Sequence, residues 1–500
     1  MENLSRHWQP NCHYNNAIGF YNRTVGEFYM ATFGNKKCRQ KMRPRKKREF
    51  IGVGVFCSAL LAASCTHIDV DPAKNQKPMV TTYNHTIQSA LPTDIGTDLI
   101  ARAVGNQHET HQLVNAVMEQ IQNPLVAGNH SELLIDGPET FNELLAAIDR
   151  AQHNIHLETY IFADDNLGTR VKRHLVARAA QGVKVRVIYD AVGSMTTDNK
   201  FFDEMRQVGI EVKEYKPINL ENTASWRINN RDHRKLMIID GRQVFVGGVN
   251  ISDTYQSSSA SNPGYERGQE EGWRDTHLKI SGPAAILFQH YFVDTWLRLE
   301  GNIEAEEQHI FPKIKADGDT LVSAVASHGE KDEVKIYASY ITAIENSRKS
   351  IHITNGYFVP NERMEEALIA AVKRGVAVKL IVPEFSDSTI TLAASQASFD
   401  DLLEGGVQIY LFDDALLHAK TAVFDSVVAM VGSSNLDSRS FLHNNELNAV
   451  VVDAGFGREL EKTFARDLAE SKPLTQQQWQ QRGLQQRAKE LLGKVVSYWL

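Results

Sequence analysis

The chain has 500 residues, of which 42% are hydrophobic and 23% are charged, as in an ordinary globular protein of two or three domains with ample core. Its formal net charge is −7 at pH 7. Proteins that bind the phosphate backbone of nucleic acids are more often basic, so this charge disfavours nucleic acid as a partner.

The N-terminus is basic instead. The stretch "KMRPRKKREF" precedes the apolar run "IGVGVFCSALLAAS", which is too short to span a bilayer comfortably and ends in small residues before Cys65. This pattern predicts a secretory signal peptide or anchor over residues 42–64. The ending "LAASC" resembles the lipobox of bacterial lipoproteins and implies a lipidated Cys65, although Ala62 stands where that motif more often has Leu. An uncleaved membrane anchor is the alternative.

The segments around this signal have simpler interpretations. Residues 1–41 precede Met42, where a signal peptide would begin, and we interpret them as an extension that depends on the choice of start codon. Residues 65–97 are polar with scattered Pro and Asn and are predicted to be a tether. No cysteine follows Cys65, so the mature chain has no disulfide and no cysteine-based metal site. The predicted location is the bacterial cell envelope, with the protein membrane-anchored on the periplasmic side.

Two stretches then alternate strand and helix patterns in the same order. The first is "NIHLETYIFADDNLGTRVKRHLVARAAQGVKVRVIYD" and the second is "SIHITNGYFVPNERMEEALIAAVKRGVAVKLIVPE". Each predicts a strand, a helix with Asp or Asn near its start and a closing glycine (Gly182, Gly375), and a second strand. A further helix and strand follow in "FFDEMRQVGIEVKEY" and "SFDDLLEGGVQIYLF". Alternation of this kind predicts an α/β sheet covered on both faces.

Each stretch leads into the same polar motif. Residues 231–250, "RDHRKLMIIDGRQVFVGGVN", and 416–435, "LLHAKTAVFDSVVAMVGSSN", agree in residue type at five positions. At about 5% usage per residue type, such agreement at a given start arises roughly once in three million trials, so a duplicated unit is the economical explanation. The first set is His233, Lys235, Asp240, Gly247 and Asn250, and the second is His418, Lys420, Asp425, Gly432 and Asn435.

The spacing of these residues indicates their chemistry. Residues two apart in a strand face the same side, so each set presents an imidazole and an ammonium group together. Asp240 and Asp425 fall at a strand end, where they are expected to fix a hairpin turn instead of touching substrate. Gly247 and Gly432 are expected to let backbone approach a ligand closely. Two imidazoles, two ammonium groups and two amides around one point would suit a phosphodiester.

With both motifs complete, the sequence resembles the phospholipase D superfamily, whose signature is H-x-K-x4-D followed by G-[GS]-x-N. Over roughly residues 131–480 it is similar to bacterial cardiolipin synthases, through stretches such as "GWRDTHLKISGPA", "NGYFVP" and "VGSSNLDSRSFLHNNELNAVV". The resemblance implies two α/β repeats, each a mixed sheet flanked by helices, related by a pseudo-two-fold axis with one active site at their interface. Residues 98–315 and 316–500 are the predicted repeats.

The resemblance also implies a two-step reaction that the residue types support. One histidine attacks phosphorus to form a phosphohistidine, and the other protonates the departing alkoxide and then acts as base toward the incoming hydroxyl. We assign His233 as nucleophile and His418 as acid and base, with the reverse assignment left open. The non-bridging oxygens would be held by four side chains, Lys235, Lys420, Asn250 and Asn435. No metal and no cofactor is expected.

An attacking imidazole needs a carboxylate at its other nitrogen, and Glu446 and Asp275 occupy positions that the family uses for this. Other candidates are weaker. His277 is expected to be a packed strand residue, and Arg439 could reach a head group, although a structural ion pair is favoured. The C-terminal helix sets five residues on one face, for which core packing is the expectation and membrane contact the alternative. These five are Leu484, Ala488, Leu491, Val495 and Trp499.

The function that follows is transfer of a phosphatidyl group between phospholipids, two phosphatidylglycerols giving cardiolipin and glycerol, at a membrane surface. One alternative is a phospholipase D or other phosphodiesterase that uses water as acceptor, and nothing in the sequence decides between the acceptors. The other alternative is a non-catalytic envelope lipoprotein. Such a protein would be expected to have lost at least one of the six catalytic side chains, and none is missing.

Overall fold

The computed structural model describes residues 80–84, 87–90, 93–218, 230–257, 272–303, 307–329 and 334–497. The predicted signal, the predicted lipidation site Cys65, most of the tether and Trp499 lie outside these ranges. In the part of the chain that is described, no helix is both long and apolar enough to cross a membrane.

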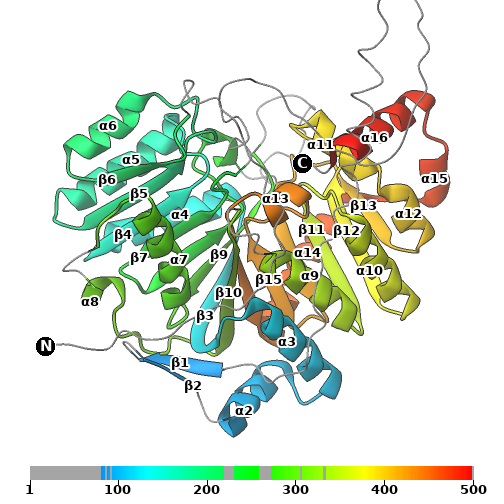
Figure 1. Cartoon of the computed structure of the whole chain (residues 1–500), viewed down its shortest axis with the longest axis horizontal. Coiled ribbons are helices and arrows are strands. Elements are labelled where there is room, and N and C mark those ends of the chain that lie inside the picture. Colours follow the sequence, from blue (N-terminus) through cyan, green and yellow to red (C-terminus); the bar gives the residue numbers. More distant parts are fainter. Residues whose placement is uncertain are drawn as a thin grey trace, which may run out of the picture. The chain divides into compact units, whose positions relative to one another are not determined.

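Two mixed sheets repeat one strand order (Figure 1). The first sheet runs β6 (Glu211–Tyr215), β5 (Lys184–Asp190), β4 (Asn154–Thr159), β7 (Lys235–Ile239), β8 (Gln243–Gly247), β9 (Thr276–Ser281) and β3 (Leu125–Ile135). The second runs β13 (Gln408–Phe412), β12 (Ala377–Pro383), β11 (Ser350–Asn355), β14 (Lys420–Phe424), β15 (Val428–Gly432), β16 (Glu446–Val452) and β10 (Thr320–Ser327). In each sheet the first three strands are parallel and the others antiparallel. The predicted duplication and mixed α/β class are therefore confirmed.

The two sheets join where β3 pairs with β10 in antiparallel fashion. Smaller strands extend the edges: β17 (Ser471–Leu474) pairs with β13, and the hairpin of β1 (Val80–Asn84) and β2 (Ile87–Ala90) adds to β3 through β1. The predicted halves are thus parts of one continuous hydrogen-bonded framework.

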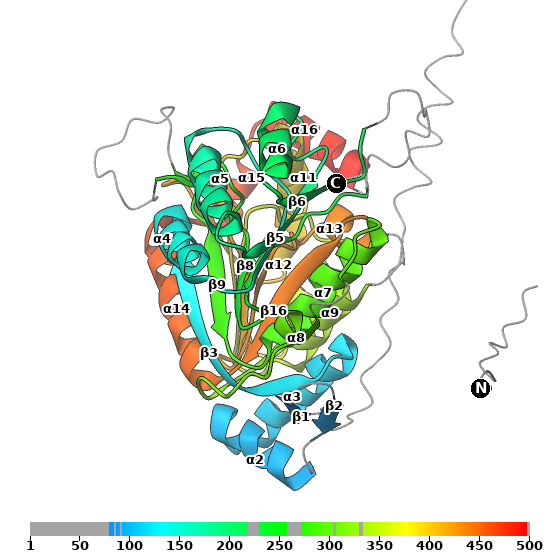
Figure 2. The ribbon, with the colours of Figure 1, turned by 90° about the vertical axis from the view of Figure 1, so that its left-hand side faces the viewer.

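Helices cover the outer faces of both sheets (Figures 1 and 2). The first sheet carries α4 (Asp136–Arg150), α5 (Asn166–Ala179) and α6 (Asn199–Gln207), and the second carries α9 (Lys335–Asn346), α10 (Glu362–Lys373) and α12 (Phe399–Glu404). A third core joins the inner faces of the two sheets, and α7 (Ala285–Arg298) and α14 (Ala454–Ala469) contribute to it. Short helical elements are α8 (Glu307–Ile310), α13 (Ser438–Leu442), α15 (Gln476–Gln480) and the 3-10 turn η2 (Asp253–Tyr255).

Strand alternation explains how one strand serves two cores. In β7, Leu236 and Ile238 lie in the inner core, whereas Met237 and Ile239 lie under the outer helices. The polar residues predicted near the helix starts do cap the helices. Asp165 caps α5 by accepting a hydrogen bond from Gly168 N at 2.9 Å. Asn361 caps α10 in the same way. Gly182 and Gly375, both with φ of 89°, lie in the turns that follow α5 and α10.

The helices α2 (Thr93–Val104) and α3 (His108–Ile121) depart from the predicted division of the chain. Residues from 98 onward were assigned to the first repeat, yet α3 packs against α9 of the second half. Leu113 and Val117 of α3 lie in one core with Tyr337 and Ile341 of α9. The boundary at residue 98 therefore does not follow the packing, because the apolar face of α3 is buried against the other sheet's helices.

The expected core packing of the C-terminal helix α16 (Leu484–Val496) is wrong. Leu484 is 86% exposed and Leu491 is 67% exposed. The helix instead packs against α11 (Thr389–Gln396) through Glu490 and Gly493, which are its buried residues. Sequence periodicity identified the apolar face but not the direction in which it points.

Candidate active site

The two predicted motifs meet at the junction between the halves. Lys235 and Lys420 are the first residues of β7 and β14. His233 and His418 lie two residues before them, just outside the strands. Each lysine Nζ donates to the carbonyl oxygen of its own motif's histidine, at 2.7 Å for Lys235. The predicted pairing of imidazole and ammonium group within each motif is thus built into the local backbone.

Main-chain hydrogen bonds cross between the halves at both histidines. His233 N donates to Asn445 O at 2.9 Å, and His418 N donates to Arg274 O at 2.8 Å. Asn445 belongs to the second half and Arg274 to the first. Each motif is therefore anchored by backbone of the other half.

The side chains cross in the same way. His233 Nδ1 lies 3.0 Å from Glu446 Oε1, and His418 Nδ1 lies 2.7 Å from Asp275 Oδ2. Both carboxylates are completely buried. An ionised carboxylate only accepts hydrogen bonds, so the Nδ1 atoms carry the protons and the Nε2 lone pairs are left for chemistry.

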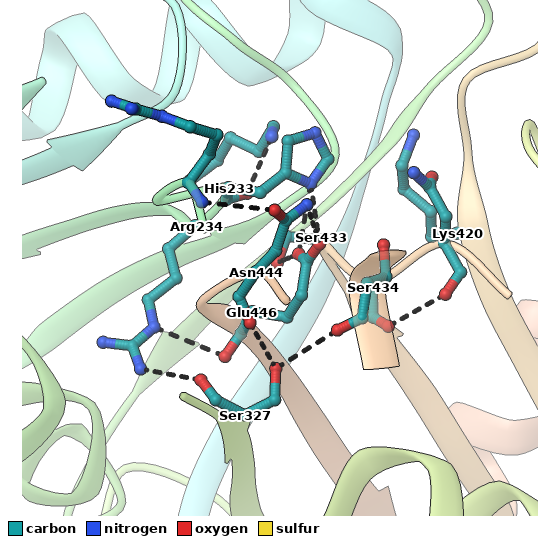
Figure 3. Close-up of polar contacts among 12 residues, drawn as sticks. His233, Arg234, Ser327, Lys420, Ser433, Ser434, Asn444 and Glu446 are labelled. Carbon is teal, nitrogen blue, oxygen red and sulfur yellow. Dashed lines mark hydrogen bonds and ion pairs between the residues drawn. The ribbon is translucent and has the colours of Figure 1, made fainter. Parts of the chain in front are cut away.

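Glu446 is held by a polar network (Figure 3). Ser433 Oγ donates to Glu446 Oε2 at 2.5 Å, and Asn444 Nδ2 approaches Oε1 at 3.5 Å. Arg234, completely buried, donates from Nε to the main-chain oxygen of Glu446 and from Nη2 to Ser327 O. These contacts fix the position of the carboxylate from which His233 takes its orientation.

Asp275 is supported differently. Its Oδ1 accepts from Thr276 N at 2.7 Å, and its carboxylate occupies the space beside Gly248. A Cβ added to Gly248 would lie 2.1 Å from Asp275 Oδ1. The Tyr255 hydroxyl is a second neighbour of His418 Nδ1, at 3.2 Å. Gly248, which corresponds to Ser433 of the other half, thus leaves room for the Asp275 carboxylate.

Aromatic rings that sequence reasoning missed also line the site. The Tyr160 ring lies 5.0 Å from the His233 ring, and the Tyr357 ring lies 5.8 Å from the His418 ring, measured between centroids. Lys235 Nζ and Lys420 Nζ lie over these tyrosines at 5.2 and 5.6 Å. The signal was present, because an aromatic residue follows the first strand of each repeat in "ETYIF" and "TNGYF".

The two motif asparagines differ in their contacts. Asn250 Oδ1 accepts from Ile161 N at 3.2 Å, and its Nδ2 donates to the Tyr255 hydroxyl at 3.0 Å. Asn435 Oδ1 is buried without a hydrogen-bond partner among the described residues. This amide oxygen is therefore an unpaired hydrogen-bond acceptor among the described residues.

The motif glycines pack closely against the neighbouring strands. A Cβ at Gly247 would lie 2.6 Å from His277 Cα, and one at Gly432 would lie 2.0 Å from Asn448 Oδ1. The space that a side chain would need beside each glycine is filled by the neighbouring strand. These glycines serve close strand packing next to the site.

Asp240 and Asp425 lie at the far ends of β7 and β14, in turns with φ of 51° and 52°. Asp240 accepts from the backbone N–H groups of Gln152, His153 and Asn154 at 2.9, 2.7 and 3.0 Å. Asp425 does the same for Arg348, Lys349 and Ser350. The aspartates therefore lie in the predicted turns, and their carboxylates hold the neighbouring connections that lead into β4 and β11.

Burial dominates the electrostatics of the site. It lowers the pKa of Lys235 to about 7 and that of Lys420 to about 8, although nearby carboxylates oppose both shifts. Burial also lowers the pKa of both motif histidines, which extends their neutral form to lower pH than is usual for an imidazole. It raises the pKa of Asp275 to about 6. The charge of Lys420 contributes to the lowered pKa values of Lys235 and His233, so the two motifs share one site.

Two weaker candidates have clear outcomes. His277 is 3% exposed in β9 and burial lowers its pKa to about 4, which confirms a packed strand residue. Arg439 makes no ion pair within the described residues, and its Nε is buried without a partner. The favoured ion pair is therefore wrong for the described part of the chain. The nearby carboxylate of Asp437 caps α13 by accepting a hydrogen bond from Ser440 N at 2.7 Å.

Comparison with known proteins agrees with this geometry. A family model described as "Cardiolipin synthase, PLD-like domain" matches residues 144–262 and 340–468. A cardiolipin synthase of Listeria monocytogenes (serotype 4b, strain CLIP80459) is 35% identical over 374 residues, 75% of this chain and 76% of that protein. The major cardiolipin synthase ClsA of Bacillus subtilis (strain 168) is 35% identical over 378 residues, 74% and 75% of the two chains.

A solved structure adds support for the fold alone. The crystal structure of the phosphatidylserine synthase of Haemophilus influenzae Rd KW20 superposes with a TM-score of 0.55 at 14% identity, covering 73% of this chain and 92% of that one. The family model and the sequence relatives show that the chain belongs to the cardiolipin synthase family with phospholipase D-like domains.

Proposed function

We propose that this chain is a cardiolipin synthase-like phosphatidyltransferase that joins two phosphatidylglycerols into cardiolipin and releases glycerol. The observation that carries the proposal is the convergence of two imidazole–lysine pairs, each imidazole bound at Nδ1 to a buried carboxylate from the other half. Family membership supports phospholipids as the class of substrate.

In the first step, His233 Nε2 attacks the phosphorus of one phosphatidylglycerol. An N–P bond forms, the P–O bond to the head-group glycerol breaks, and His418 in its protonated form gives its Nε2 proton to the leaving oxygen. The negative phosphate beside His418 favours that protonated form, against the lowering effect of burial and of the two lysines. Glycerol then leaves, and a phosphatidyl group remains on His233.

In the second step, neutral His418 takes the proton from a head-group hydroxyl of a second phosphatidylglycerol. The hydroxyl oxygen attacks phosphorus, the N–P bond breaks, and cardiolipin forms while His233 is regenerated. The proton that His418 gave in the first step is thereby returned.

The remaining motif residues would stabilise charge on the phosphoryl oxygens. Lys235 and Lys420 supply positive charge at the site, and the side-chain N–H groups of Asn435 would donate to the same oxygens. Asn250 keeps one N–H after its contact with Tyr255. Glu446 and Asp275 would stabilise the positive charge that each imidazole acquires during the reaction.

Product analysis tests the proposal. The purified protein is incubated with phosphatidylglycerol labelled in both its acyl chains and its glycerol head group. Cardiolipin and free glycerol in equal amounts are the expected products. Phosphatidic acid as the main lipid product would mean that water is the acceptor, and no product at all would contradict catalysis of this class.

We also propose that the chain acts at a membrane, anchored on the periplasmic side of a bacterial envelope through a lipidated Cys65. The basic, apolar and small-residue sequence before Cys65 supports this proposal. Mass spectrometry of the mature protein from the membrane fraction should find acyl chains on Cys65, and Cys65→Ser should leave the precursor uncleaved. An unprocessed N-terminus in the unaltered protein would contradict the lipoprotein proposal and indicate an uncleaved signal anchor.

A further inference from the structure

An apolar surface stands out among the described residues at helices α11 and α16, which lie side by side in Figures 1 and 2. We call it the α16 face. It combines large hydrophobic side chains that are each at least one-third exposed, and Leu484, at 86%, is the most exposed. The α16 face consists of Ile390, Leu484, Leu491, Leu492 and Val495.

Helix α16 is attached by the side opposite to this face. Gly493 contacts α11 so closely that an added Cβ would lie 2.5 Å from Ala394 N, and Gln486 Nε2 donates to Gln396 Oε1 at 2.6 Å. Glu490 is buried and paired with Arg482 at 2.9 Å. At 3.6 residues per turn, these docking residues lie about 180° from the leucines. The helix therefore packs by its polar and small residues and presents its apolar residues outward.

Helix α11, which carries Ile390 of the α16 face, begins beside the active site. Ser388 caps α11, and the preceding residue, Asp387, accepts from the Tyr357 hydroxyl at 2.6 Å. The Tyr357 ring is in turn 5.8 Å from the ring of His418. One short segment thus links the exposed face to the catalytic imidazole.

The first half carries exposed apolar residues at the same edge of its sheet. Met195, 67% exposed, and Ile218, 50% exposed, follow β5 and β6, whose carboxyl ends lie beside that of β4. Tyr160, next to His233, directly follows β4. Apolar side chains are therefore exposed at the active-site edge of both halves.

We infer that the α16 face inserts into the interfacial layer of a phospholipid bilayer and brings the active site to the lipid head groups. Arg487, Lys489 and Lys494 are exposed on the same helix and would meet anionic head groups. A second copy of the chain is a poorer partner for this face. A symmetric contact would bring the positive charges of the two copies close together, where they repel each other. The inference rests on the proposed function for its choice of lipid as partner.

Depth-dependent fluorescence quenching tests the contact without relying on catalysis. Leu491→Trp and Leu492→Trp are compared in the full chain with Leu297→Trp, a control at an exposed position of the largely buried helix α7. On phosphatidylglycerol vesicles with brominated acyl chains, we expect the added emission to be quenched at 491 and 492 but not at 297. Equal quenching at all three positions, or none at 491 and 492, would overturn the inference.

Turnover tests whether the contact serves the active site. A variant with Leu484→Gln, Leu491→Gln and Leu492→Gln is compared with the control Ile95→Gln plus Leu297→Gln. We expect the first variant to lose at least about tenfold in rate on phosphatidylglycerol vesicles and to change by less than about twofold on a short-chain, monomeric phosphatidylglycerol. An equal loss on both substrates would overturn the inference by assigning these leucines to the fold.

Two further outcomes keep the inference distinct from the proposed function. If the unaltered protein turns over neither substrate, the proposed function fails, whereas quenching at positions 491 and 492 still supports membrane contact. Analytical ultracentrifugation addresses self-association. A dimer that the three glutamine substitutions dissociate would overturn the inference in favour of a second copy of the chain.

Discussion

At the scale of single residues, the two halves differ at one motif position, which is Gly248 in the first half and Ser433 in the second. Gly248 leaves room for Asp275, whereas Ser433 donates a hydrogen bond to Glu446. We expect Gly248→Ala to push the Asp275 carboxylate away from His418 and to lower kcat about 100-fold. A flexible carboxylate yields easily, so the melting temperature should change little.

Ser433→Ala is the matched change in the other half. It removes one donor to a carboxylate and creates no clash, so we expect a loss of kcat of about tenfold. Gly483→Ala, where an added Cβ meets no described atom within 4 Å, serves as the control and should be neutral. Equal activity of Gly248→Ala and the unaltered protein would show that the contact between Asp275 and His418 does not matter for turnover.

The lysines predict how anion binding depends on pH. The pKa of Lys235 is lowered to about 7 and that of Lys420 to about 8, so both carry charge below pH 7 and lose it as pH rises through 7 and 8. Both histidines, with lowered pKa values, stay neutral in this range. We therefore expect the inhibition constant of a phosphate analogue to rise between pH 6 and pH 9.

Lys235→Arg provides the control for this profile. The guanidinium keeps its charge throughout the range, so the part of the profile near pH 7 should flatten. Inhibition by the analogue that does not change between pH 6 and pH 9 in the unaltered protein would contradict titration of the lysines in the free site.

At the scale of elements, each motif aspartate holds a turn. Asp240 accepts three backbone N–H groups just before β4 at a residue with positive φ. We expect Asp240→Ala to lower the free energy of unfolding by about 3 kcal/mol and Asp240→Asn to lower it less, because Asn keeps an acceptor and tolerates this φ. Urea unfolding gives the comparison.

The same variants should keep their kcat per folded molecule. Asp240 lies at the opposite end of β7 from Lys235, about 17 Å away at the usual rise of a strand. A folded Asp240→Asn protein with strongly reduced kcat would instead place this carboxylate in the catalytic machinery.

Local sequence patterns predicted the helices and strands well. The contacts between distant parts of the chain depend on packing and could not be predicted in this way. The helix caps, the closing glycines and the paired H-x-K spacing are properties of short stretches and could be read directly. The partners of His233 and His418 are 213 and 143 residues away, so their crossing depends on how the halves dock. Periodicity likewise identified the apolar side of α16, while its outward direction depends on Gly493 packing against α11.

At the scale of the whole molecule, the crossing makes the site indivisible. Each imidazole is held by a carboxylate and a main-chain group of the other half, and Arg274 adds a buried ion pair to Asp467 of α14 at 2.7 Å. Neither half contains a complete histidine environment of its own. The duplicated motif has thus produced one site with two unequal histidines instead of two independent sites.

This unity predicts the behaviour of the histidine variants. We expect His233→Ala and His418→Ala each to lose nearly all turnover, and the double variant to be hardly worse, because residues that act as a unit are not additive. Since both motifs come from one chain, mixing the two single variants should restore nothing. Half of the activity surviving in a single variant would indicate two independent sites, and recovery on mixing would indicate a site shared between chains, which the contacts within this chain argue against.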